Sequence, residues 1–270
     1  MKGWTLDDVP WQRFAPEKVD PGLLAAVKAA ALVEHNGRDY ETYLHHVFAD
    51  DPEFRAAVST WAQEEVRHGL ALAAWAKRAD PGFDFEARFR RFRDGYRLPL
   101  DATSSVRGSR SGELIARCVV EAGTSSFYTA LSTASDEPVL KEICRLIAAD
   151  EFRHYKLFYD TLGRYLKSER IGRARRLWVA VGRVLESEDD ELSFAYYCGN
   201  DLAGPYRRKD CARAYERRVG PVYRPGHLAR GVAMVLKAGG VRPQGWVGRN
   251  LSRLAWYAFR WRSATPAAAG

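Results

Sequence analysis

Between positions 52 and 79, a mostly hydrophobic series of residues recurs at spacings of four and three, which is typical of a helix that buries one side. This series reads Phe54, Val58, Trp61, Glu65, His68, Leu72 and Trp75. The same spacing returns after residue 138, in the series Leu140, Cys144, Ile147, Glu151, His154 and Phe158. Each series predicts a long helix whose inner side carries one Glu and one His among large apolar groups.

Each of these helices follows another predicted helix. The helix that precedes the first series runs from residue 21 to about 48, because Asp20 can cap it and Pro21 suits its first turn. Asp51 and Pro52 then cap and begin the next helix. The third helix spans about 111–134, with one inner side formed by Leu114, Glu121, Ser125 and Tyr128.

The four helices predict an all-α protein with a ferritin-like four-helix bundle over residues 21–166. The Arg- and Phe-rich residues 83–110 would form the crossover between its two hairpins. Residues 1–20 predict an irregular N-terminal arm packed on the body. Residues 167–270 predict a basic extension of additional C-terminal helices on or beside the bundle, with a solvated boundary at residues 188–191.

The bundle supplies a repeated set of metal-binding side chains. Glu and His three residues apart share one face of a helix, so both can reach one metal ion. A lone Glu precedes each pair, by 31 residues in the first hairpin and by 30 in the second. Four-helix carboxylate proteins use this layout of two Glu-x-x-His pairs and two single glutamates. The predicted ligands are Glu34, Glu65, His68, Glu121, Glu151 and His154.

This ligand set predicts two iron ions, or an iron and manganese pair. Carboxylates with one imidazole per metal suit these ions, whereas zinc favours Cys or additional His in a closed site. Four glutamates carry four negative charges, which two divalent ions neutralise; without metal their burial would be costly. We expect Glu65 and Glu151 to bridge the metals, and the two lone glutamates to be terminal.

An acid and an arginine accompany each Glu-x-x-His pair. A ligating His usually donates the hydrogen of its other ring nitrogen to a carboxylate or carbonyl. Glu64 and Asp150 are the candidates, each reaching the His of the opposite hairpin. Arg67 and Arg153 would neutralise them. The alternative is that these four residues form ordinary surface ion pairs along their helices.

Other residues near the ligands have two interpretations. The Thr124 hydroxyl would either point toward the metals, where it could relay a proton, or bond to its own helix backbone. Gly37, Gly69 and Gly123 would either leave room for dioxygen or substrate, or allow close helix packing. The remaining histidines are expected in solvated or capping roles: His35, His45, His46 and His227.

The two motifs resemble those of a known family. Residues 64–69 are similar to the Glu-Glu-x-Arg-His-Gly motif of the soluble acyl-(acyl carrier protein) desaturases, which are ferritin-like di-iron carboxylate proteins. Residues 150–154 resemble their second motif, Asp-Glu-x-Arg-His. In that family a Thr three residues after the third-helix Glu lies beside the dioxygen site, and Thr124 matches it. The resemblance covers about residues 30–160 and implies dioxygen activation at two irons, with Thr124 as a catalytic residue.

Charge and composition bear on partners and location. Residues 1–166 carry 22 Lys and Arg against 25 Asp and Glu, whereas residues 167–270 carry 20 against 9. The positive extension would attract an acidic acyl carrier protein, a membrane surface or nucleic acid. The four cysteines form no C-x-x-C site, so electrons would come from an external donor protein. Residues 1–8 lack the apolar core of a signal peptide and no apolar run reaches 18 residues, so we expect a cytoplasmic protein, free or peripheral to the membrane.

These features predict a non-haem di-iron oxidoreductase, expected as a homodimer, that uses dioxygen to desaturate or hydroxylate an organic substrate. An acyl chain on a carrier fits both the resemblance and the positive extension. One alternative is a monooxygenase of a quinone precursor, an arylamine or a tRNA base, with residues 245–262 on a membrane or on RNA phosphates. Further alternatives are a non-catalytic ferritin-like iron-binding or storage protein, and a pseudo-enzyme that binds a partner.

Overall fold

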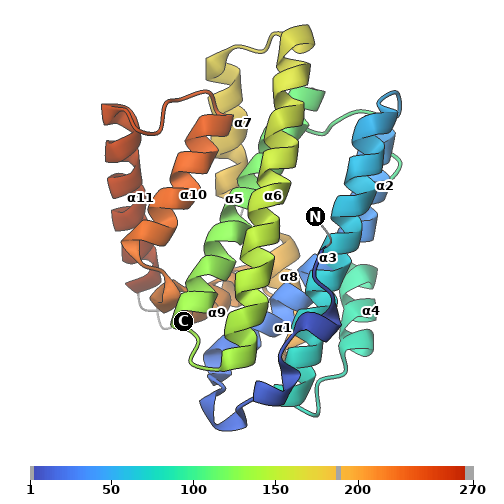
Figure 1. Cartoon of the computed structure of the whole chain (residues 1–270), viewed down its shortest axis with the longest axis vertical. Coiled ribbons are helices and arrows are strands. Elements are labelled where there is room, and N and C mark those ends of the chain that lie inside the picture. Colours follow the sequence, from blue (N-terminus) through green and yellow to red (C-terminus); the bar gives the residue numbers. More distant parts are fainter. Residues whose placement is uncertain (1–2, 187–189, 265–270) are drawn as a thin grey trace.

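The computed structural model describes residues 3–186 and 190–264, in which every regular element is a helix and no β-strand occurs. This confirms the predicted all-α class. Short 3-10 turns occupy the N-terminal arm (Figure 1). The α-helices are α1 (Pro21–His35), α2 (Gly37–Val47), α3 (Pro52–Ala79), α4 (Phe85–Gly95), α5 (Arg110–Ala134), α6 (Pro138–Glu169), α7 (Arg173–Leu185), α8 (Asp190–Gly199), α9 (Arg208–Val219), α10 (Pro225–Ala238) and α11 (Trp246–Ala264).

The long helices pack as two antiparallel pairs. Helix α1 packs on α3, α5 packs on α6, and α3 also contacts α6, so the Glu-x-x-His helices are neighbours (Figure 1). Local hydrogen bonds fix the starts of α1 and α3. The Asp20 carboxylate accepts from the backbone N–H of Leu23 at 2.8 Å, and Asp51 accepts from that of Phe54 at 3.0 Å. Both predicted caps are therefore confirmed.

The predicted single helix over residues 21–48 is wrong, because the chain leaves helical geometry at Asn36 and resumes in α2. The break lies where α1 and α2 come closest to α3. A Cβ built on Gly37 would lie 2.7 Å from Glu65 Cβ, and one built on Gly69 would lie 2.6 Å from the backbone nitrogen of His35. Glycine at these two positions therefore permits close helix packing and leaves no added space.

The crossover between the two pairs contains a helix that the sequence pattern did not identify. Asp84 caps α4 by accepting from the Ala87 N–H at 3.0 Å. The rings of Phe85 and Phe89 then pack against the ring of His35, with centroids 5.1 and 4.6 Å away. The Phe residues of this segment thus cover the end of α1, and His35 has a packing role.

The C-terminal helices flank α1 and α5. Helices α8 and α9 pack on α1, α7 and α10 pack on α5, and α11 packs on α10. The predicted boundary at residues 188–191 is wrong at Glu191, which is buried in α8 and accepts from the Tyr40 hydroxyl at 2.6 Å. Residues 188 and 189 lie outside the described part. Among the described helices, none has the length and hydropathy that crossing a lipid bilayer requires.

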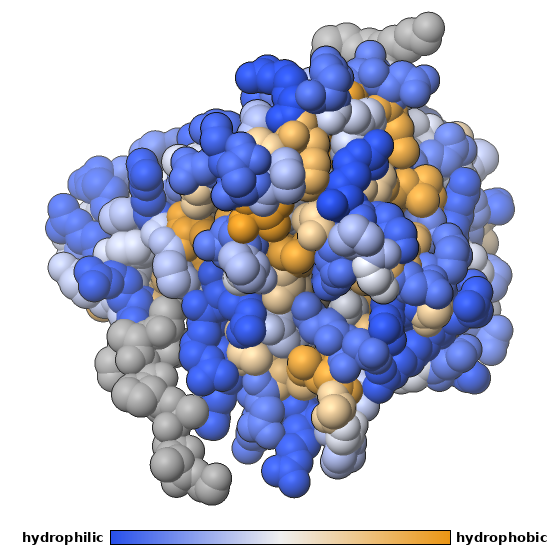
Figure 2. Space-filling model, turned by 90° about the horizontal axis from the view of Figure 1, so that it is seen from below, coloured by the Kyte–Doolittle hydropathy of each residue, from blue (hydrophilic) through white to orange (hydrophobic). Residues whose placement is uncertain are grey.

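Two clusters of buried apolar side chains fill the interior. One includes Leu32, Leu72, Tyr128 and Ile147, and the other includes Trp61, Val119, Tyr155 and Phe158. On α3 and α6 the predicted ligands fall between the positions that contribute to each cluster. The end of the molecule seen in Figure 2 has hydrophobic side chains toward its middle and hydrophilic ones at its margin.

A pair of glycine substitutions tests the close packing of α1 on α3. We expect Gly69→Ala to lower the free energy of unfolding by about 1–3 kcal/mol, because its Cβ would meet the backbone of His35. The matched control is Gly123→Ala on α5, where a Cβ meets nothing within 4 Å. That change should raise the free energy of unfolding by up to ~1 kcal/mol, since Ala is the better helix former. Urea denaturation measures both, and equal effects would contradict the close approach.

Candidate metal centre

The structure brings the six predicted ligands together as two overlapping groups. Glu34, Glu65, His68 and Glu151 form one group, and Glu65, Glu121, Glu151 and His154 form the other. Within each group the potential ligand atoms lie within 4.8 Å of one another. Each group contains one His and one lone Glu, and the two groups share Glu65 and Glu151. This is the arrangement expected of two adjacent metal ions that are bridged by the two shared carboxylates.

All six side chains are buried between the two apolar clusters; the most exposed, Glu65, is only 9% exposed. They come from four helices: Glu34 from the last turn of α1, one Glu-x-x-His pair from α3, Glu121 from α5 and the second pair from α6. Four carboxylates at this depth need positive charge or protons close by. The cluster is therefore not explained as an ordinary part of the core.

The polar atoms that face the middle of the cluster lack protein hydrogen-bond partners within the described residues. They are Glu34 Oε2, Glu65 Oε1, His68 Nδ1, Glu151 Oε1 and His154 Nδ1. His68 Nδ1 lies 3.2 Å from Glu151 Oε1, and His154 Nδ1 lies 2.9 Å from Glu65 Oε1. Native interiors rarely leave even one such group unsatisfied. Five that converge on one region fit a bound cation pair, so the residues present suit the metals that the sequence implies.

The other ring nitrogen of each His contacts a carboxylate on the opposite helix. His68 Nε2 lies 3.0 Å from Asp150 Oδ2, and His154 Nε2 lies 2.8 Å from Glu64 Oε2. These contacts place the ring hydrogen on Nε2 and leave the lone pair of Nδ1 directed into the cluster. The two acids expected to orient the histidines thus occupy that position, each across the α3 and α6 interface.

Two arginines surround these outer acids. Arg67 donates to Asp150 at 3.0 Å, and Arg153 donates to Asp150 at 2.5 Å and to Glu64 at 3.3 Å. Arg67 also lies 3.4 Å from Glu64, so the ion pairs run both along the helices and between them. Although burial raises the pKa of Asp150, hydrogen bonds with His68 and Arg153 hold it well below its ordinary value. Hydrogen bonding with His154 likewise lowers the pKa of Glu64 against the effect of burial.

Two aromatic residues that contact a predicted ligand or an outer acid were not assigned a role from the sequence. The Trp4 indole N–H donates to Asp150 at 2.9 Å, and its ring stacks on His68 with 5.9 Å between centroids. The Tyr128 hydroxyl donates to Glu34 Oε1 at 2.6 Å. Tyr128 follows Glu121 by seven residues on the inner side of its helix, and that spacing was the available signal. Trp4 lies in an irregular arm, which offers no such signal.

Thr124 makes both kinds of contact considered for it. Its hydroxyl lies 3.2–3.3 Å from the backbone carbonyls of Glu121 and Val120, and it also donates to Glu151 Oε2. The side chain is only half-buried, whereas the carboxylate that it contacts is almost fully buried. Thr124 therefore places a hydroxyl between a shared carboxylate and the outside of the cluster.

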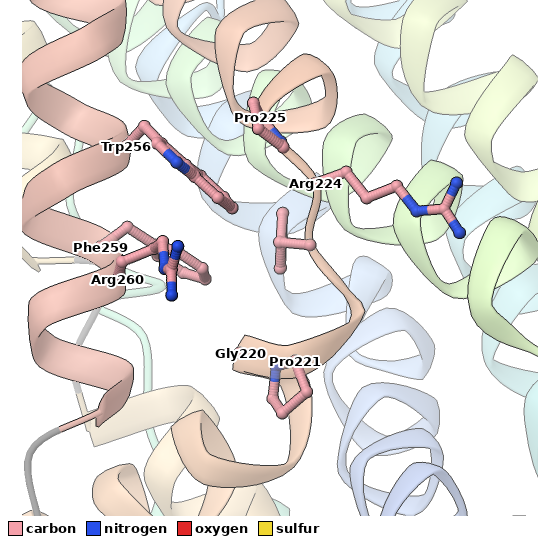
Figure 3. A pocket seen from close by; sticks show the side chains of 8 residues that line it. Gly220, Pro221, Arg224, Pro225, Trp256, Phe259 and Arg260 are labelled. Carbon is pink, nitrogen blue, oxygen red and sulfur yellow. The ribbon is translucent and has the colours of Figure 1, made fainter.

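The remaining polar candidates lie elsewhere. His45 Nε2 contacts the Arg55 carbonyl at 3.0 Å, His46 contacts that of Leu100, and His227 accepts the N–H of Arg224 at the start of α10. All four cysteines are buried and free. A surface pocket of about 360 Å³ lies between α11 and the segment before α10, and Trp256, Phe259 and Arg260 point into it from α11 (Figure 3). None of its lining residues is a carboxylate, His or Cys.

No protein-family model and no curated protein matches the chain. Support for a metal centre therefore comes from the geometry of the chain's own side chains.

Metal stoichiometry tests the shared and single ligands. We expect Glu65→Gln or Glu151→Gln to abolish binding of both ions, because each substitution removes a carboxylate from both groups. Glu34→Gln or Glu121→Gln should leave one ion tightly bound. Glu113→Gln is the control, since Glu113 is a buried glutamate of α5 outside the cluster. Elemental analysis after Fe²⁺ or Mn²⁺ loading gives the counts, and the same loss in all four ligand variants would contradict the shared arrangement.

The pH dependence of metal binding tests the electrostatics. Burial and the charge of Glu151 raise the pKa of Glu121 to about 7, and burial with the charges of Glu151 and Glu34 raises that of Glu65. Burial lowers the pKa of both histidines, but the surrounding carboxylates outweigh it and raise the pKa well above its ordinary value. Groups with a raised folded-state pKa stabilise the protein at low pH and lose that contribution as pH rises.

The metal-free protein should therefore lose stability from about pH 4.5 upward through pH 7, as protons leave the cluster. Bound Mn²⁺ replaces those protons, so the increase in Tm that it causes should grow between pH 5.5 and pH 8. Each additional 1 kcal/mol of stabilisation by Mn²⁺ corresponds to a further increase in Tm of roughly 2–4 °C. Differential scanning calorimetry with and without Mn²⁺ measures this increase. A shift that is constant or shrinks with pH would show that protons and metal do not compete for these side chains.

Proposed function

We propose that the protein is a ferritin-like di-iron oxidoreductase that uses dioxygen to desaturate or hydroxylate an organic substrate. The observation that carries this proposal is the pair of ligand groups that share Glu65 and Glu151, each with one His backed by a carboxylate. Iron and manganese suit such oxygen-rich sites better than zinc, which favours Cys or additional His. A pair of iron ions bound there would supply the redox chemistry with dioxygen.

The side chains of the protein perform three tasks at this centre. The apolar clusters on either side keep bulk water away from the six ligands, which strengthens every electrostatic interaction among them. Asp150 and Glu64 hold the imidazoles with Nδ1 turned inward. Tyr128 holds one oxygen of Glu34 by donating to it, which leaves the other oxygen for a metal ion.

Thr124 is the residue proposed to move protons. Its hydroxyl touches Glu151 from the half-exposed side of the cluster, so it can pass a proton between that carboxylate and the outside. Forming two waters from dioxygen consumes four electrons and four protons. Desaturation of one carbon–carbon bond supplies two of each. Hydroxylation also takes two electrons from the substrate, but one oxygen atom then enters the product and only one water forms. The other two electrons must come from a donor.

An external protein is proposed as that donor. Besides the cluster itself, the described residues contain no grouped Cys or His that would hold a second redox metal. The proposed substrate is an acyl chain on an acidic carrier protein. Support for this choice is the excess of Lys and Arg in residues 167–270, together with the motif resemblance at residues 64–69 and 150–154.

The direct test measures dioxygen use by Fe²⁺-loaded protein with a chemical reductant and an acyl carrier substrate. We expect one oxidised product for each dioxygen consumed. Storage or simple iron binding would instead oxidise Fe²⁺ in proportion to the iron added, without turnover of an organic substrate. Failure to consume dioxygen beyond the iron added would contradict an oxygenase of any substrate, whereas uncoupled consumption would contradict the acyl substrate alone.

The role of Thr124 is tested by Thr124→Val, which keeps the shape of the side chain and removes its hydroxyl. We expect unchanged metal content and about 100-fold slower turnover, a typical loss for a proton-transfer group. Thr129→Val is the matched control on the same helix, because the Thr129 hydroxyl bonds only to the backbone carbonyl of Ser125, at 2.7 Å. Equal rates in the two variants would remove Thr124 from the mechanism.

A further inference from the structure

Helix α7 (Arg173–Leu185) leaves a stripe of large apolar side chains in solvent. Trp178 is 74% exposed and Leu185 is 68% exposed, with Val181 and Val184 exposed beside them. A helix turns by about 100° per residue, so Trp178, Val181 and Leu185 lie along one side. The opposite side, with Val179, Ala180 and Arg183, is buried in the protein. The helix is therefore held in place by one face and presents the other.

Positive charge borders this stripe. Lys167, Arg170, Arg173 and Arg175 are exposed at or before the start of α7. By the same helical geometry, Arg173 and Arg175 fall on either side of the stripe defined by Trp178 and Leu185. Between residues 167 and 185 the sequence contains six Lys and Arg but one acid, Glu169.

Glu169 and Glu186, the described acids that flank α7 in the sequence, are already engaged. The Glu169 carboxylate accepts the backbone N–H groups of Arg110 and Ser111 at 3.0 and 2.7 Å, at the start of α5. Glu186 pairs with Arg107 at 2.5 Å. Among the residues that the structure describes, no carboxylate pairs with Arg173 or Arg175, and both arginines are exposed, so they remain available to an external anion.

We propose that α7 docks on the surface of a bilayer that contains anionic phospholipid. The stripe would enter the boundary between head groups and acyl chains, where Trp is favoured, while Arg173 and Arg175 meet lipid phosphates. A second copy of the chain is the other candidate occupant, and the sedimentation measurement below separates it from the bilayer. This inference rests on α7 and is independent of the oxidation chemistry proposed above.

The test is co-sedimentation of the full-length protein with vesicles, either of phosphatidylcholine alone or with 30% phosphatidylglycerol. We expect at least tenfold stronger binding to the anionic vesicles, and a decrease as salt rises from ~50 to ~500 mM because the charges are screened. The double variant Trp178→Ser/Leu185→Ser should reduce binding at least tenfold. Arg173→Gln/Arg175→Gln should remove most of the preference for anionic vesicles.

A matched control comes from α11, where Leu254 is 63% and Tyr257 is 69% exposed. Leu254→Ser/Tyr257→Ser removes the same types of side chain from an equally basic helix, and it should leave vesicle binding within twofold of the parent. Circular dichroism confirms that each variant is folded. The proposal is overturned if the parent binds neither vesicle, or if the α11 variant loses as much binding as the α7 variant. It is also overturned if sedimentation velocity shows a dimer that only the α7 variant disrupts.

Discussion

The structure depends on the burial of four carboxylates in one layer of a helical interior. Carboxylates repel one another and lose hydration there, so the fold tolerates them only with compensating positive charge. Two imidazoles and two arginines supply part of it, yet five ligand atoms have no hydrogen-bond partner among the residues that the structure describes. A pair of divalent cations would complete the balance. The same requirement explains why ligands from four helices converge on one layer.

Much of the surrounding structure serves this layer. Gly37 and Gly69 let α1 and α2 approach α3 closely in the region of Glu65. The N-terminal arm places Trp4 on Asp150, and α5 places Tyr128 on Glu34. Apolar clusters above and below the layer keep it dry. Through Gly37, Trp4 and Tyr128, the carboxylate layer links elements that are far apart in the sequence.

The sequence alone was enough to predict the helical class, two helix caps and the six side chains of the cluster. This was possible because helix periodicity is local: Glu65 and His68 stand in an apolar series, and a second series repeats them at Glu151 and His154. The break at Asn36 was not predictable, since it depends on how closely α1 and α2 meet α3. The buried position of Glu191 depends on Tyr40, 151 residues away, and Trp4 reaches Asp150 from an irregular arm. Such contacts between distant residues leave no periodic trace.

The most direct test of the central claim is anomalous X-ray scattering from crystals of the metal-loaded protein. Data collected on both sides of the iron absorption edge should show two peaks about 3.5–4 Å apart, the separation typical of two-metal sites. Glu65 and Glu151 should lie between the peaks, with His68 Nδ1 bound to one metal and His154 Nδ1 to the other. A single peak, peaks outside this layer, or histidines bound through Nε2 would contradict the account.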